Sequence, residues 1–177
     1  MKPLLDSIEK RFSPVEFSNE IPGKEDLETL FDAARRAPSS FNEQPWRFIY
    51  STRNDETSWK RMLNLLVPDN QKWAMTAPVL MLSVAKKTSL VTGKPNIYYF
   101  HDTGMAMGNL LNQATSMGLY VHQMGGYRRK KAREQLNIPD EYEPVAMMAI
   151  GYLKNEDDGK PFDRNAIEDF TFQGKWH

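Results

Sequence analysis

The sequence predicts helices packed on a single central sheet, in an α+β or α/β sandwich. Four or five strand candidates are separated by helical stretches, and the helix candidates cover more of the chain than the strand candidates do. One apolar run, residues 79–85, has the length and composition of a strand buried on both faces, so we expect it at the centre of the sheet. A chain of 177 residues can bury a sizeable core, and we expect a single domain over residues 1–177.

Hydrophobic periodicity assigns the other elements. Apolar residues recur at helical spacing in five stretches, which we expect to be helices: 3–11, 22–37, 55–66, 96–117 and 128–136. Residues 70–76 fit a short helix or a turn. Extended apolar runs give the remaining strand candidates: 46–51, 120–124 and 145–152.

The longest helix candidate, residues 96–117, carries unusually small side chains. Gly104 and Gly108 lie in its interior, where each glycine costs about 1 kcal/mol relative to alanine. We therefore expect another helix or a ligand to approach this helix closely.

Composition excludes several classes of function. Lys plus Arg equals Asp plus Glu, so the net charge is zero and no overall field attracts nucleic acid or an anionic membrane. The absence of cysteine excludes thiol nucleophiles, disulfides and Cys-ligated metal sites. The N-terminal residues acquire charge too early for a secretory segment, and no apolar run reaches transmembrane length. We expect a soluble cytoplasmic protein that binds neither nucleic acid nor membrane.

The usual catalytic motifs are missing as well. His101, His122 and His177 are too far apart for metal-ligand spacing, so no metal site is expected. Adjacency of His101 and Asp102 does not indicate a catalytic pair, because neighbours on a helix point about 100° apart. No nucleophile elbow, dinucleotide fingerprint or phosphate loop is present. If the protein is an enzyme, we expect a cofactor to supply the difficult chemistry and no side chain to act as catalyst.

One polar loop, within residues 35–48, stands out from this background. Its hydroxyls and amides lie between two prolines that restrict the backbone, and the donors and acceptors are Ser39, Ser40, Asn42 and Gln44. Such a loop suits a flat ligand rich in heteroatoms. The same composition is also typical of an ordinary helix-to-strand connection.

The loop contains the specific sequence Pro-Ser-Ser-x-Asn-x-Gln-Pro-Trp, which begins at Pro38. It occurs together with four further segments, 11–14, 104–118, 122–127 and 149–152, and itself lies within residues 34–48. In the order and spacing of these segments the chain resembles, over nearly its whole length, the nitroreductase-like, FMN-dependent oxidoreductase family. The resemblance implies an α/β/α sandwich with a mostly antiparallel sheet, and a homodimer with two FMN sites at the subunit interface. It also makes residues 155–177 a candidate tail that packs on the partner subunit.

The resemblance further implies which residues bind FMN. The residues that follow the first helix, and a basic residue late in the chain, match the family's residues that bind the FMN phosphate. The loop beginning at Pro38 matches the segment that lies over the flavin ring from the other subunit. An amide near the middle of the chain and a Gly-Gly turn match groups that contact the ring and its N5 atom. The implied set is Arg11, Phe12, Ser13, Pro38, Ser39, Ser40, Asn42, Asn70, Gln123, Met124, Gly125, Gly126 and Arg164.

Elementary chemistry agrees with parts of this set. Arg11 and Arg164 offer planar donors that suit a phosphate, and Ser13 adds a neutral donor. Glycine at 125 or 126 would let a backbone N–H approach the ligand, although a turn with positive φ is an alternative reason for either glycine. Val15 and Phe162 stand where many family members carry further cations.

The resulting hypothesis is an FMN-dependent oxidoreductase that uses NAD(P)H. Hydride would pass to the flavin and then, in a ping-pong reaction, to a small acceptor such as a nitroaromatic or a quinone. Two alternatives stay open: a specialised reaction of the family, such as reductive dehalogenation or flavin fragmentation, and a flavin-binding protein with little turnover. The basic run 128–131 is interpreted as a solvated helix start, or as an attractor for the phosphates of a nicotinamide cofactor.

Overall fold

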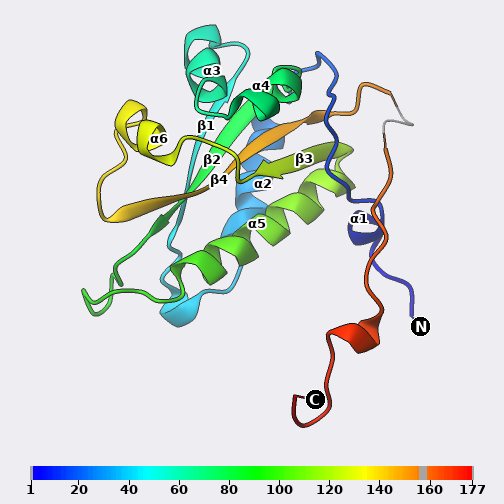
Figure 1. Ribbon diagram of the computed structural model, residues 1–177, viewed down its shortest axis with the longest axis vertical. Helices are drawn as coiled ribbons and strands as arrows, with labels where there is room; N and C mark the ends of the chain where they lie inside the picture. The colour runs from blue at the N-terminus through cyan, green and yellow to red at the C-terminus, as the bar shows by residue number, and fades with distance from the viewer. Residues whose placement is uncertain (1, 156–158, 177) are drawn as a thin grey trace.

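The computed structural model describes residues 2–155 and 159–176 of the chain (Figure 1). Its helices are α1 (Asp6–Glu9), α2 (Lys24–Arg35), α3 (Glu56–Leu63), α4 (Pro68–Ala74), α5 (Tyr99–Ser116) and α6 (Arg129–Gln135), with 3₁₀ turns η1 (Ser40–Asn42) and η2 (Ile167–Asp169). Its strands are β1 (Trp46–Thr52), β2 (Val79–Lys86), β3 (Leu119–Met124) and β4 (Tyr142–Tyr152). Every expected strand is present.

The four strands form one antiparallel sheet in the order β1-β2-β4-β3. Strand β2 lies between β1 and β4, and Val79 pairs with Thr52 on one side and with Ile150 on the other. All residues of β2 except the last are buried. The prediction of a central strand over residues 79–85 is therefore confirmed, and the fold is α+β.

Helices cover both faces of this sheet (Figure 1). Alternate residues of β2 belong to different cores, because successive side chains of a strand point to opposite faces. Val79 and Met81 pack in the core under α2 and α5, whereas Leu80 and Leu82 pack in the core under α3, α4 and α6. This two-sided burial explains why the sequence of β2 shows no polar alternation.

Strand β4 begins at Tyr142, three residues before the start expected from sequence. Pro144 cannot donate a ladder hydrogen bond, which argues against a strand at that point. The structure accommodates the proline next to a β-bulge between Ser83 and Val84. The Ser83 hydroxyl both donates to the carbonyl of Ala146 and accepts from its N–H, at 3.2 Å each, and so replaces ladder bonds.

Helices α1 and α5 both start later than expected. Helix α1 is only four residues long, and the apolar residues of the helix expected over 3–11, Leu4, Leu5 and Ile8, are exposed, so the predicted amphipathic helix buries no apolar face within the protomer. Helix α5 starts at Tyr99 rather than at residue 96, because the Asn96 side chain accepts the N–H of Tyr98 at 3.0 Å and turns the chain before the helix begins.

The two interior glycines of α5 face open space among the described residues of the protomer. A Cβ built on Gly104 or Gly108 would meet no atom within 4 Å. The expected close approach to these glycines is therefore not made by any described residue of the same chain.

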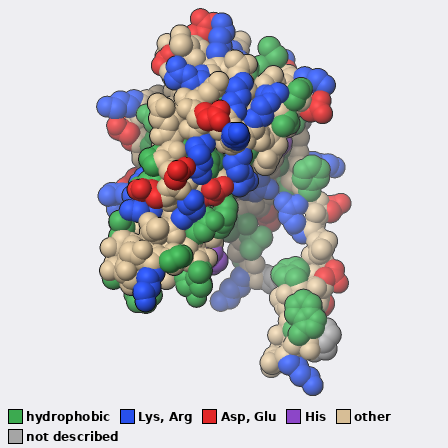
Figure 2. Space-filling view, turned by 60° about the vertical axis from the view of Figure 1, so that its left-hand side comes forward, with side chains coloured by type: hydrophobic (Ala, Val, Ile, Leu, Met, Phe, Trp, Pro, Cys, Tyr) green, Lys and Arg blue, Asp and Glu red, His purple; other side chains and the backbone are tan. Residues whose placement is uncertain are grey.

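The C-terminal tail leaves the body of the protein (Figure 1). Phe162 and Trp176 in this tail are 76% and 84% exposed. Figure 2 shows hydrophobic side chains on the surface of the tail. At its start, Gly159 lies against the ring of Phe12, where an added Cβ would come within 2.7 Å. Residues 156–158 and 177 of the expected tail lie outside the described residues.

Membrane-spanning helices and groups of metal-ligating side chains are both absent from the described residues. None of their helices combines the length and hydropathy needed to cross a bilayer. Nor do the described His, Asp and Glu side chains gather in groups of three or more that could hold a metal ion.

The basic run 128–131 is exposed, but it is bound to the protein as well as to solvent. Arg128 donates to the carbonyls of Asn64 and Leu66 at 3.1 and 2.7 Å, and Lys131 donates to that of Asn64 at 3.3 Å. These carbonyls follow the C-terminus of α3, where cations are favoured by the helix dipole. Arg128 and Lys131 thus bind the carbonyls that follow α3, a structural role that was not evident from the sequence.

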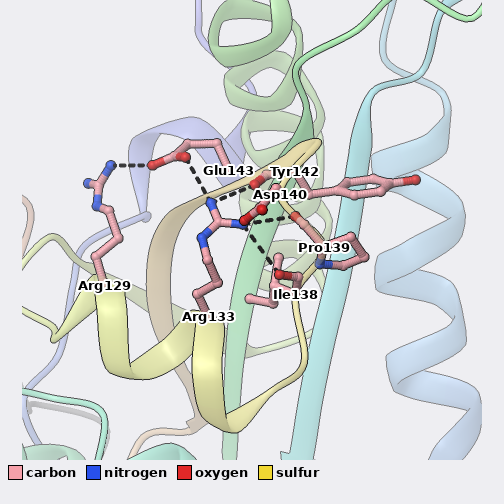
Figure 3. Close-up of polar contacts among 7 residues, drawn as sticks. All are labelled: Arg129, Arg133, Ile138, Pro139, Asp140, Tyr142 and Glu143. Atoms are coloured by element: carbon pink, nitrogen blue, oxygen red, sulfur yellow. Dashed lines mark hydrogen bonds and ion pairs between the residues drawn. The ribbon is translucent and has the colours of Figure 1, made fainter.

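Arg133 on the same helix fixes the turn that leads into β4 (Figure 3). Its guanidinium donates to the carbonyls of Ile138, Pro139 and Tyr142 at 3.3, 2.8 and 2.7 Å, and to the carboxylate of Glu143 at 3.1 Å. The planar fork satisfies several acceptors that would otherwise lose their partners.

We expect Arg133→Met to lower the free energy of unfolding by about 2 kcal/mol, because it removes charge-assisted hydrogen bonds to partly buried acceptors. The matched control is Arg129→Met, which removes an exposed ion pair with Glu143 and should cost less than about 1 kcal/mol. Urea unfolding of both variants measures the difference. Equal effects would show that the turn does not depend on the Arg133 contacts.

Candidate functional site

Two sets of expected site residues, the loop 38–42 and the segment that carries Arg11, lie at opposite ends of α5. The loop 38–42 lies at the N-terminal end, where the N–H of Ser40 donates to Asp102 at 3.0 Å. The segment that carries Arg11 follows α1, and α1 borders a hollow together with Thr115 and Ser116 at the C-terminal end. Asp102 and Ser116 are roughly 21 Å apart along the helix axis. Within one protomer the two groups are therefore separated (Figure 1).

The loop 38–42 has an unusual backbone. Phe41, Asn42 and Gln44 all have positive φ, at 50°, 56° and 46°, a conformation that is uncommon for residues other than glycine. The Ser39 hydroxyl accepts the N–H of Gln44 at 3.0 Å and helps to hold this shape. Phe41 is 87% exposed at the tip of the loop. Strained loops of this kind persist where the surrounding contacts over-determine them, and they are common at ligand sites.

Glu43 ties this loop to the turn before α5. Its buried carboxylate accepts from the Ser89 hydroxyl and from the N–H groups of Leu90 and Val91, the latter at 2.6 and 3.3 Å. These hydrogen bonds, led by that of Ser89, hold the pKa of Glu43 below its usual value. The loop is thus fixed from both sides, by Asp102 and by Glu43.

His101 and Asp102 pair with each other, which corrects the interpretation from the sequence. Nδ1 of His101 lies 3.0 Å from Oδ1 of Asp102, although the residues are neighbours on α5. They lie in the first turn of the helix, and Asp102 is buried where it also receives the Ser40 N–H. A hollow beside this pair is lined by Pro38, Ser39, Ser40, Phe41, Tyr98, His101 and Asp102.

Arg164 acts electrostatically on Arg11 in the second group. Burial, together with the positive charge of Arg164, lowers the pKa of Arg11. Among residues 2–155 and 159–176, neither guanidinium forms an ion pair with a carboxylate. Within that part of the chain, Arg11 and Arg164 are two unpaired cations in electrostatic range of each other, and Arg11 is partly buried.

The positions where many family members carry further cations add no charge here, and Arg35 does not replace them, because it bonds to Asp32 on its own helix α2. Val15 and Phe162 are both exposed and add no charge.

The segment 11–14 alternates between outward and inward residues. Arg11 and Ser13 are half-buried, whereas Phe12 and Pro14 are buried. The Phe12 ring packs on Tyr120, with a centroid distance of 4.8 Å. For Phe12, as for the buried Met124, the side chain belongs to the core, so only the backbone remains available to a ligand.

Gly126 is required by local packing. Its carbonyl accepts from the Asn70 side chain at 3.0 Å and from the N–H of Val67 at 3.1 Å, and a Cβ at this position would come within 2.7 Å of Asn70. Gly125 differs, because a Cβ there would meet nothing within 4 Å. Of the two glycines, only Gly125 borders open space, beside the exposed Gln123.

His122 is a residue of this group that the sequence reasoning missed. Its Nδ1 lies 2.8 Å from the carbonyl oxygen of Pro14, and its ring stacks on Trp73 with a centroid distance of 4.3 Å. Burial lowers its pKa, and the hydrogen bond to Pro14 opposes that shift. From sequence, His122 was rejected as a metal ligand and was included in the family-like segment 122–127, but no role was expected for its side chain; its place in the strand next to Gln123 was the available signal.

Known proteins share this architecture. The nitroreductase family model matches residues 8–152 of the chain. A crystal structure described as an oxidoreductase containing FMN superposes with a TM-score of 0.91 at 34% identity, and covers 99% of this chain and 94% of that one.

Curated relatives cover nearly the whole chain. A protein of Archaeoglobus fulgidus, provisionally named NADH dehydrogenase/NAD(P)H nitroreductase, is 28% identical over 99% of this chain and 100% of its own length. The iodotyrosine deiodinase of Thermotoga neapolitana is 27% identical over 94% of this chain and 96% of its own. The match to the family model and the agreement of the fold together show that this chain belongs to the nitroreductase family.

Proposed function

We propose that the protein is an FMN-dependent oxidoreductase that uses NAD(P)H to reduce a small acceptor, such as a nitroaromatic or a quinone. The observation that carries the proposal is the pair of Arg11 and Arg164, two cations in electrostatic range of each other, neither of which pairs with a carboxylate among the described residues. The phosphate of FMN supplies nearly two negative charges and suits a pair of guanidinium forks. The FMN content of the structural relative supports the same cofactor.

The residues at the phosphate end fit this group. Arg11, Ser13 and Arg164 would hold the phosphate, and Asn70 and Gly125 lie on segments bound to each other through Gly126. When bound, FMN supplies the redox chemistry, taking hydride from NAD(P)H and passing it on to the acceptor. The chain contributes binding and orientation, and no side chain is needed as nucleophile or obligatory base.

The ring end would come from a second subunit. A two-fold axis across the middle of α5 would set the loop 38–42 of one protomer beside Arg11 of the partner subunit. Gly104 and Gly108 are free of intrachain neighbours and would allow the two copies of α5 to approach closely. The exposed aromatic tail and the uncovered apolar residues of α1 supply further surface for the same dimer.

Reductive dehalogenation is the second candidate function. The specific observation in its favour is the similarity to an iodotyrosine deiodinase over almost the whole chain. The same cofactor site would serve either reaction, so the acceptor and not the flavin distinguishes them.

FMN retention tests the phosphate assignment. Purified wild-type protein should be yellow and release stoichiometric FMN on denaturation. Arg11→Ala should weaken FMN binding roughly 10- to 100-fold, because it removes charge-assisted hydrogen bonds. Lys131→Ala, the matched loss of a cation on α6, should change it little. A colourless protein that FMN cannot reconstitute, or equal losses in both variants, would reject the assignment.

Oligomeric state tests the shared site. Gly108→Leu should shift the protein to a monomer in sedimentation and reduce FMN binding, since the larger side chain blocks the approach of a second α5. The protomer itself should stay folded, because the added atoms start in open space and glycine is a weak helix former. Lys130→Leu on α6 is the surface control. A Gly108→Leu dimer with full flavin content would contradict this interface.

Turnover separates the candidate functions. FMN-loaded protein should oxidise NAD(P)H when menadione or a nitrofuran is supplied, with parallel-line kinetics typical of a ping-pong reaction. Halide release from an iodophenol without reduction of those acceptors would favour dehalogenation. Loaded protein that turns over none of the three would favour a flavin-binding role.

A further inference from the structure

We infer that His122 is a positioning residue for the phosphate end of the cofactor site: it holds the segment 11–14 on strand β3 so that Arg11 and Ser13 face outward. The inference rests on the proposed function, since it concerns how the chain prepares a site for FMN. His122 itself is not expected to touch the reacting atoms.

The first observation is the hydrogen bond from His122 to the backbone beside Ser13. Nδ1 of His122 lies 2.8 Å from the carbonyl oxygen of Pro14, which can only accept a hydrogen bond. The proton must therefore be on Nδ1. This single contact joins two parts of the chain that are 108 residues apart in sequence.

A second observation is the alternation of the segment 11–14. Tyr120 and His122 are two residues apart on β3, so their side chains lie on the same face of the strand. Tyr120 packs on the ring of Phe12, and His122 bonds to Pro14. Phe12 and Pro14 are thus held against β3 on either side of Ser13. The Ser13 side chain is left on the side of the segment that faces away from β3.

The third observation is that His122 joins this segment to the rest of the group. Its ring stacks on Trp73 at an interplanar angle of 29°, and Trp73 lies one helical turn after Asn70 on α4. A second contact between these two parts of the chain is the hydrogen bond that the N–H of Phe17 donates to the Thr76 hydroxyl, at 3.2 Å. The same strand continues directly into Gln123 and the two glycines.

Through these contacts His122 connects three segments of the chain, which a side chain that only fills space in a core would not do. The imidazole connects the segment of Arg11, the helix of Asn70 and the strand that leads to Gly125. An apolar replacement could keep the stacking on Trp73, but it would release the Pro14 carbonyl. Loss of this hydrogen bond should therefore weaken binding of the FMN phosphate more than binding of the flavin ring.

The test compares FMN with riboflavin, which has the same ring but no phosphate. Dissociation constants are measured by flavin fluorescence for the wild type, His122→Asn and His122→Gln. Asparagine can place its amide nitrogen near the position of Nδ1, whereas glutamine places its amide nearer to that of Nε2. The two variants are otherwise matched in polarity.

We expect His122→Gln to weaken FMN binding roughly tenfold, as for the loss of one hydrogen bond, with a much smaller change for riboflavin. His122→Asn should keep FMN affinity close to that of the wild type. Equal losses for FMN and riboflavin, or rescue by glutamine as good as that by asparagine, would overturn the inference.

A measurement on the unaltered protein covers the case in which a variant does not fold. Nitrogen NMR of the His122 imidazole should show the proton on Nδ1 at neutral pH, and a proton on Nε2 alone would overturn the inference. Failure of the proposed function gives a different result. In that case the wild type binds neither FMN nor riboflavin, whatever the state of His122.

Discussion

Burial of β2 and β4 on both faces is the constraint on which the rest of the structure depends. Each strand contributes side chains to both cores, so helices must cover both sides of the sheet. On one side this cover is α5, which runs from the Asp102 end to the end near α1. The length of α5 then separates the loop 38–42 from Arg11. A site that needs both groups would have to be completed by a second chain, so the proposed dimer would follow from the layered packing.

Within each group, hydrogen bonds to the backbone fix the parts that would contact a ligand. Asp102 and Glu43 hold the loop 38–42 from opposite sides, while Asn70 and Val67 bind the carbonyl of Gly126. Two carboxylates thus hold the loop 38–42, whereas Arg11 and Arg164 pair with no carboxylate among the described residues.

Much of this was predictable from the sequence, and the exceptions have physical causes. The apolar run of β2 identified the central strand, because two-sided burial removes polar alternation. The start of β4 was missed because Pro144 normally ends a strand, and only the bulge at Ser83 shows how it is accepted. The pairing of His101 with Asp102 depends on side-chain rotation, which helical spacing does not describe. His122 was missed because its partner is a backbone carbonyl, and backbone groups leave no mark in the sequence.

The central claim is that each site combines Arg11 of one chain with the loop 38–42 of the other. Mixed dimers test it most directly. If Arg11→Ala and Asn42→Leu subunits each bind FMN poorly as homodimers, a heterodimer of the two contains one doubly altered site and one unaltered site. We predict that mixing restores tight FMN binding at about half of the sites in that heterodimer. No recovery in isolated heterodimers, with both altered chains folded, would contradict a site shared between subunits.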